Sequence, residues 1–77
     1  MARVPHYKTN VSPYRVQVLD RALAALAILA NNSSDCRLAE LCPALKLHKS
    51  TVHRLMMVLE QHRLVVKNPE TGRYRLG

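Results

Sequence analysis

Large aromatic residues are scarce in this sequence. Its 77 residues include no tryptophan and no phenylalanine, and the three tyrosines are Tyr7, Tyr14 and Tyr74. Proteins that read single-stranded RNA usually stack several bases on aromatic side chains, and three scattered tyrosines do not supply such a platform. The apolar share of 48% comes almost entirely from leucine, valine and alanine, which favours a small, helix-rich core.

Long apolar segments are also lacking. No stretch free of charge is long enough to cross a membrane, and the N-terminus has no apolar region of the kind found in signal peptides. We therefore predict a cytoplasmic protein that does not interact with a membrane. The two cysteines, Cys36 and Cys42, are then expected to be reduced thiols at apolar positions rather than a disulfide.

Zinc binding is the alternative use of these cysteines. Together with His48 and His53 they form the pattern C-x5-C-x5-H-x4-H. Zinc fingers have more closely spaced cysteines and a longer gap between cysteine and histidine, so the pattern argues against a metal site. We predict no metal and no other cofactor.

Acidic residues are few, and the basic residues are unevenly distributed. Twelve lysines and arginines face five aspartates and glutamates, which gives a formal net charge of +7. Residues 46–77 contain seven of these basic residues and two of the acidic ones. A segment this basic is expected to bind a polyanion, and nucleic acid is the main candidate once a membrane surface is set aside.

The hydrophobic pattern divides the chain into an arm and a single domain. Residues 1–15 contain Pro5 and Pro13 and follow no periodic pattern, which predicts a flexible basic arm. Such an arm could lie along a DNA groove, and the alternative is a terminus without a role. Residues 16–77 are predicted to form the folded domain.

Three helices are predicted where apolar residues recur at helical spacing. The first covers residues 16–31, the second residues 38–45, and the third opens near Lys49. Pro43 removes a backbone donor, so the second helix should be short or bent. The stripes are Leu19, Ala22, Leu23, Leu26, Leu29 and Ala30; Leu38, Leu41, Cys42 and Leu45; and Val52, Leu55, Met56 and Leu59.

A β-hairpin is predicted after the third helix. Residues 64–67 favour a strand, residues 68–72 (Asn-Pro-Glu-Thr-Gly) a tight turn, and residues 73–76 a second strand. Arginines alternate with apolar residues in the second strand, so one face can pack on the helices while the arginines reach solvent or phosphate. The predicted fold is mainly α with a small β-hairpin: a winged helix-turn-helix of three helices and a wing.

This arrangement predicts sequence-specific binding to double-stranded DNA. In the helix-turn-helix plan, the N-terminal residues of the second of two linked helices enter the major groove. The third predicted helix presents a polar, cationic face, on which Arg54 could form two hydrogen bonds with guanine, and the wing adds cations for the phosphate backbone. The residues expected to contact DNA are Lys49, Ser50, Thr51, His53, Arg54 and Met57 of the helix, and Lys67, Arg73 and Arg75 of the wing.

Other functions compete with specific DNA reading. Lys49 and Arg54 could neutralise phosphates only. The outward helix face could instead serve as a protein-docking or dimerisation module, since a fold does not fix a function, although the positive charge argues against it. An enzyme is not expected, because Ser50 and His53 share a helix but Glu60 lies about two and a half turns from Ser50.

Three segments carry a resemblance to a known family. They are Leu19-Asp20-Arg21-Ala22-Leu23 in the first predicted helix, Ser50-Thr51-Val52-His53-Arg54-Leu55 in the third, and Gly72-Arg73-Tyr74-Arg75-Leu76-Gly77 in the wing. In this order and spacing, over residues 16–77, they resemble the N-terminal domain of IclR-type bacterial transcriptional regulators.

The resemblance implies further properties of the whole protein. Such a regulator is a homodimer on a pseudo-palindromic operator, and a C-terminal domain binds a small effector. These regulators continue into a linker helix where this chain ends, so we expect the effector-binding domain to be absent from it. The resemblance also places the first helix near the dimer contact, and the residues implied there are Leu19, Leu23 and Leu26.

The chain departs from the family in the link between the second and third helices. The family usually has Gly-Leu-Pro-Lys there, whereas this chain has Lys46-Leu47-His48-Lys49. Lys46 must then adopt a backbone conformation that glycine takes freely, or the turn must differ. The orientation of the third helix depends on which of the two occurs.

Overall fold

The computed structural model describes residue 14, residues 16–32 and residues 34–77. Most of the predicted N-terminal arm, residues 1–13 and 15, therefore lies outside the described residues. The elements are α1 (Gln17–Asn31), α2 (Leu38–Leu45), α3 (Lys49–Gln61), β1 (Val65–Lys67) and β2 (Tyr74–Leu76). The two strands form an antiparallel hairpin. The predicted winged helix-turn-helix is confirmed, and the predicted helices and strands match to within two residues.

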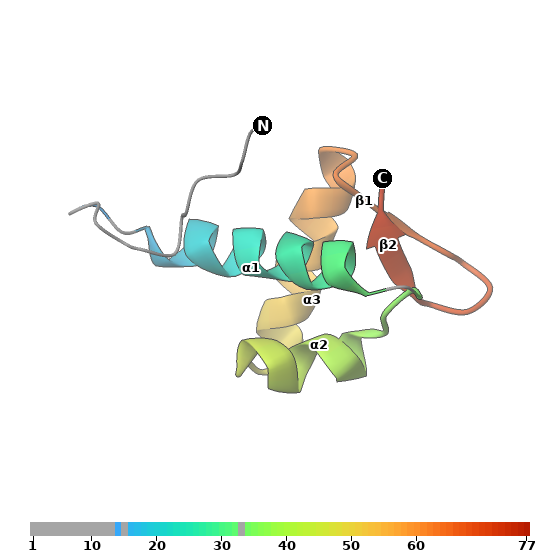
Figure 1. Cartoon of the computed structure of the whole chain (residues 1–77), viewed down its shortest axis with the longest axis horizontal. Helices are drawn as coiled ribbons and strands as arrows, with labels where there is room; N and C mark the ends of the chain where they lie inside the picture. The colour runs from blue at the N-terminus through green and yellow to red at the C-terminus, as the bar shows by residue number, and fades with distance from the viewer. Residues whose placement is uncertain (1–13, 15, 33) are drawn as a thin grey trace.

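The helices enclose a small core that the hairpin closes at one end. Figure 1 shows α1 crossing α3, α2 beside the beginning of α3, and β2 near the C-terminal end of α1. The loop between the strands projects away from the helices. The buried residues of the core cluster are Ala25, Leu29, Cys36, Leu41, Val52, Met56, Leu59, Val65 and Tyr74.

The sequence predicted the buried face of α3 correctly and that of α1 only in part. All four residues of the predicted α3 stripe are at most 7% exposed, so this face of the helix is confirmed. In α1 the buried residues are Ala25 and Leu29, whereas Leu19 and Leu23 are each 53% exposed. The predicted α1 stripe was therefore wrong in part, because α1 is apolar on more than one side and its periodicity does not define the inward face.

The turn between α2 and α3 depends on a left-handed residue. α2 is eight residues long and ends two residues after Pro43, as expected of a short helix. Lys46 then adopts φ 59° and ψ 45°, which is the left-handed conformation. This is the first of the two expected alternatives: the lysine takes the conformation that the glycine of the family would take. The N–H groups of Lys46 and Leu47 both donate to the carbonyl oxygen of Cys42. These bonds cap α2 and direct the chain into α3.

We expect Lys46→Gly to raise the free energy of unfolding by about 0.5–1 kcal/mol. Glycine avoids the steric cost that a β-carbon imposes at positive φ, although its greater freedom in the unfolded chain offsets part of the gain. Lys46→Ala is the matched control, because it also removes the ammonium group but keeps the β-carbon. Urea denaturation followed by circular dichroism measures both variants. A glycine variant no more stable than the alanine variant would contradict the account of this turn.

Candidate nucleic-acid interface

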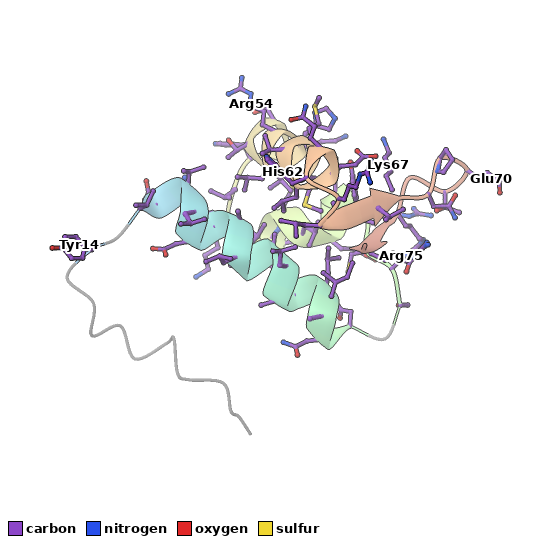
Figure 2. The ribbon with its side chains drawn as sticks, turned by 90° about the horizontal axis from the view of Figure 1, so that it is seen from above. Tyr14, Arg54, His62, Lys67, Glu70 and Arg75 are labelled. Carbon is purple, nitrogen blue, oxygen red and sulfur yellow. The ribbon has the colours of Figure 1, made fainter. Side chains whose placement is uncertain are left out.

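The surface of α3 opposite its buried stripe is polar and open to solvent. Val52 points into the core, and successive residues of a helix are rotated by about 100°. The residues two, five and nine positions after Val52 therefore point away from the core. Figure 2 shows Arg54 projecting from α3 away from α1. Met57 adds an apolar patch to this side and is 43% exposed. The exposed residues here are Ser50, Arg54, Met57 and Gln61.

The N-terminal part of α3 carries the other predicted helix contacts. The helix begins at Lys49 after His48, and no side chain caps its first amide groups. Lys49 and His53 are exposed, whereas Thr51 is half-buried. The structure thus places all six predicted helix residues on one continuous helix, and five of them are exposed. The uncapped amides and the lysine together make this end of the helix attractive to an anion.

The hairpin distributes its cations over both of its faces. Val66 pairs with Arg75, and Lys67 pairs with Tyr74. Directly paired residues point to the same face of a sheet, and neighbours along a strand point to opposite faces. Lys67 therefore lies on the same face as the buried Tyr74, with its Nζ 5.8 Å from the centre of the ring. Arg75 lies on the opposite face.

The hairpin is attached to the helices through a residue pair that the sequence did not predict. The N–H of Tyr74 donates to the carbonyl oxygen of Cys36 at 2.7 Å, and the N–H of Cys36 donates back at 2.9 Å. Both side chains face the core, and Tyr74 is 1% exposed. Cys36 acts as a single-residue third strand, which is too short to produce a recognisable alternation. Its side chain is buried, as expected at an apolar position, and its Sγ accepts a hydrogen bond from Nδ2 of Asn32 at 3.0 Å.

The buried Tyr74 has an altered acidity. Burial raises the pKa of Tyr74 above its ordinary value of 10.0, because it disfavours the charged phenolate, and the negative charge of Glu60 acts in the same direction. The folded domain therefore holds this proton more tightly than the unfolded chain does.

The loop of the wing is ordered by its own hydrogen bonds and carries an acidic residue. Asn68 accepts at its carbonyl oxygen from the N–H of Gly72 at 2.7 Å and at Oδ1 from the N–H of Glu70 at 2.8 Å. Gly72 has φ 74°, which favours glycine. Figure 2 shows Glu70 at the tip of the loop. Only the cations of the wing were predicted to take part in binding, and this carboxylate was not among the predicted residues.

Arg73 differs from the other two predicted wing cations. Its Nη1 donates to the carbonyl oxygen of Asp35 at 3.1 Å and lies 4.0 Å from Oε1 of Glu40. The guanidinium is therefore engaged within the domain. Arg75 and Lys67 are both exposed.

The residues implied for a dimer contact do not form a uniform set. Leu19 and Leu23 are exposed on α1, whereas Leu26 is half-buried and packs against the core. Val16 lies on the same side as Leu19 and Leu23 when about 100° is allowed per residue, and it too is exposed. Val16, Leu19 and Leu23 thus form an exposed apolar stripe at the N-terminal half of α1. Leu26, the third residue implied for the dimer contact, belongs partly to the core.

Two further observations concern the part of the chain that the structure describes. There, no three or more His, Cys, Asp or Glu side chains come together as ligands for a metal ion. No helix among the same residues is long and apolar enough to span a membrane.

Three helices, the left-handed turn before α3 and the attached hairpin define the winged helix-turn-helix class. Within that class, the family described as the IclR helix-turn-helix domain matches residues 18–69. The chain belongs to this family, which confirms the resemblance drawn from its sequence.

Curated relatives share the domain but are much longer. The HTH-type transcriptional regulator XynR of Escherichia coli is 34% identical over 62 residues, which are 80% of this chain and 25% of that protein. The DNA-binding transcriptional repressor YiaJ of the same organism is 42% identical over 64 residues, 83% of this chain and 23% of that protein. This chain thus spans about a quarter of the length of the curated relatives it matches.

Solved structures show the same fold. An IclR transcriptional regulator from Alicyclobacillus acidocaldarius matches 83% of this chain and 26% of its own, with a TM-score of 0.79 and 29% identity. The repressor BlcR of Agobacterium tumefaciens matches 80% of this chain and 25% of its own, with a TM-score of 0.73 and 34% identity. The Zα domain of cyprinid herpesvirus 3 ORF112, at a TM-score of 0.70 and 20% identity, shares the fold alone.

The burial of Tyr74 predicts a loss of stability in alkaline solution. Its stabilising contribution is fully present below about pH 10 and falls as the pH rises through the raised pKa of the folded state. We expect the free energy of unfolding of Tyr74→Phe to fall less between about pH 9 and pH 11 than that of the parent chain. Tyr14→Phe is the control, because Tyr14 is exposed. Urea denaturation across this range tests the claim, and identical pH profiles for Tyr74→Phe and the parent would contradict it.

Proposed function

We propose that this domain binds double-stranded DNA in a sequence-specific manner, as the DNA-binding part of a bacterial transcriptional regulator. The observation that carries the proposal is the outward face of α3. Four buried residues hold the helix against the core, so the opposite face is exposed, and the exposed residues of the helix include Lys49 and Arg54. The names of the relatives, a DNA-binding transcriptional repressor among them, support the same function.

In this proposal α3 enters the major groove, which at about 12 Å wide accepts one helix. Arg54 is exposed on the outward face of α3 and is assigned to a guanine, with which a guanidinium forms two hydrogen bonds. Met57 is assigned to the methyl group of a thymine. The N-terminal residues Lys49, Ser50, Thr51 and His53 are assigned to the edge of the groove, where the uncapped amides of the first turn are suited to a phosphate.

The hairpin is assigned to the phosphate backbone beside that groove. Lys67 and Arg75 can each displace a counterion and so add affinity without sequence preference. Lys67 and Arg75 lie on opposite faces of the hairpin. If one face of the hairpin lies against a DNA strand, only one of these two side chains reaches a phosphate of that strand. Glu70 at the tip disfavours the closest approach of that loop to a phosphate.

We further infer a homodimer on a two-fold symmetric operator. The exposed stripe of Leu19 and Leu23 offers apolar area for a second copy, with Leu26 at its margin. Half-site symmetry in DNA mirrors two-fold symmetry in the protein. A small-molecule effector would act through a part of the regulator outside these 77 residues, and a regulator of bacterial transcription works in the cytoplasm, with no catalytic role for this domain.

Replacing Arg54 and Arg75 one at a time distinguishes a contact with a base, which depends on the DNA sequence, from a contact with phosphate, which does not. We expect Arg54→Ala to lower the affinity for a duplex selected from a random pool by about 1–3 kcal/mol and to relax the base preference. Arg75→Ala should weaken binding to selected and random duplexes alike and reduce the slope of log affinity against log salt by about 0.9. Fluorescence anisotropy at several salt concentrations measures both effects.

Each outcome of these measurements bears on one part of the proposal. Equal losses on selected and random duplexes would remove the reading role of Arg54. No binding to any duplex, or binding indifferent to salt, would contradict the proposal and favour the protein-docking alternative. A two-fold repeat in the selected duplex supports the homodimer, and a single unrepeated site contradicts it.

A further inference from the structure

The wing is joined to the start of α2 by a side chain as well as by main-chain bonds. Arg73 lies immediately before β2, and its guanidinium reaches the carbonyl oxygen of Asp35 at 3.1 Å across 38 positions of the sequence. The same Nη1 atom is 4.0 Å from Oε1 of Glu40, in the first turn of α2. The side chain of Arg73 is 34% exposed, so about two thirds of it is covered by the domain.

The carboxylate near Arg73 is itself held in place. Oε1 of Glu40 accepts a hydrogen bond from the N–H of Arg37 at 2.9 Å, which closes the first turn of α2. The acceptor group is therefore fixed before Arg73 approaches it, and less side-chain entropy is lost in forming the contact. The nearby negative charge also offsets part of the positive charge that Arg73 would offer to a phosphate.

The main-chain attachment of the hairpin to the segment before α2 is short. Cys36 and Tyr74 form one residue pair with two hydrogen bonds, and both strands of the hairpin are only three residues long. On the inner face, the side chains of Val65 and Tyr74 pack in the core. The hydrogen bond from Arg73 to Asp35 adds a side-chain contact directly beside the Cys36–Tyr74 pair, one residue before each member, and so extends the attachment beyond a single pair.

We propose that Arg73 is a positioning residue, which holds the wing at a fixed orientation against α2 for DNA binding instead of contacting phosphate itself. This inference rests on the proposed function, and it reassigns one of the three wing cations. Arg75, two residues further along the chain and within β2, is exposed and serves as the matched comparison.

The first arm of the experiment needs no DNA. Amide hydrogen exchange in the free 77-residue chain should be about threefold to tenfold faster at Cys36 and Tyr74 in Arg73→Gln, because a part-exposed, charge-assisted hydrogen bond is lost. The amide of Met56 in α3 should be unchanged, which excludes global destabilisation. Arg75→Gln, which removes the same charge, should leave all three amides unchanged. Unchanged exchange at Cys36 and Tyr74 in Arg73→Gln would overturn the proposal, whether or not the domain binds DNA.

The second arm measures affinity for a random-sequence duplex and for the duplex selected from a random pool. Arg73→Gln should weaken binding about threefold to tenfold with an unchanged salt slope, whereas Arg75→Gln should lower the slope by about 0.9. A slope lowered equally in both variants would show that Arg73 contacts phosphate and would overturn the proposal. If no duplex binds, the proposed function fails, and the exchange measurement still decides whether Arg73 holds the wing.

Glu40→Gln gives an independent check. The amide oxygen still accepts from the N–H of Arg37, but the negative charge beside Arg73 is gone. If Arg73 acts through Glu40, this variant should speed exchange at Tyr74, and combining it with Arg73→Gln should add nothing further. If Arg73 contacts phosphate instead, Glu40→Gln should strengthen DNA binding more in the parent chain than in the Arg73→Gln background, which would overturn the proposal.

Discussion

The paired hydrogen bonds between Tyr74 and Cys36 are the constraint on which the position of the wing depends. Two strands of three residues are too short to be stable alone in water, and they need a surface to pack on. Tyr74 attaches the hairpin to the helical part of the domain in two ways. Its main chain hydrogen-bonds with Cys36, and its ring is buried in the core. The hairpin thereby becomes part of the same folded body as α3, so its cations keep a fixed position relative to the outward face of that helix.

The turn at Lys46 fixes the other half of the interface. α2 ends after two turns, and the left-handed residue directs the chain so that Leu47 packs on the core and α3 begins two residues later. A lysine here tolerates a conformation that glycine would take at lower cost, yet the turn of the family is kept. The orientation of α3 thus follows from the cap of α2, and its outward face follows from its four buried residues.

Much of this fold could be predicted from the sequence, and the exceptions have physical causes. The α3 stripe was predicted correctly because only one side of that helix is consistently apolar, whereas α1 is apolar on several sides and its inward face depends on tertiary packing. The third strand at Cys36 consists of one residue and has no period to detect. The placement of Lys67 and Arg75 on opposite faces could not be predicted, because it depends on how the two strands are paired. The contact of Arg73 with Asp35 could not be predicted either, because it joins segments 38 positions apart in the sequence.

The family places this chain among proteins whose fold presents a helix and a wing on one body, and the structure identifies the residues available on each. The central claim is that the outward face of α3 reads duplex DNA. A crystal structure of the 77-residue chain bound to a duplex selected from a random pool tests it most directly. We expect α3 to lie in the major groove, with Arg54 within hydrogen-bonding distance of a base edge and the hairpin beside the phosphate backbone. A complex in which the outward face of α3 is turned away from the DNA would contradict it.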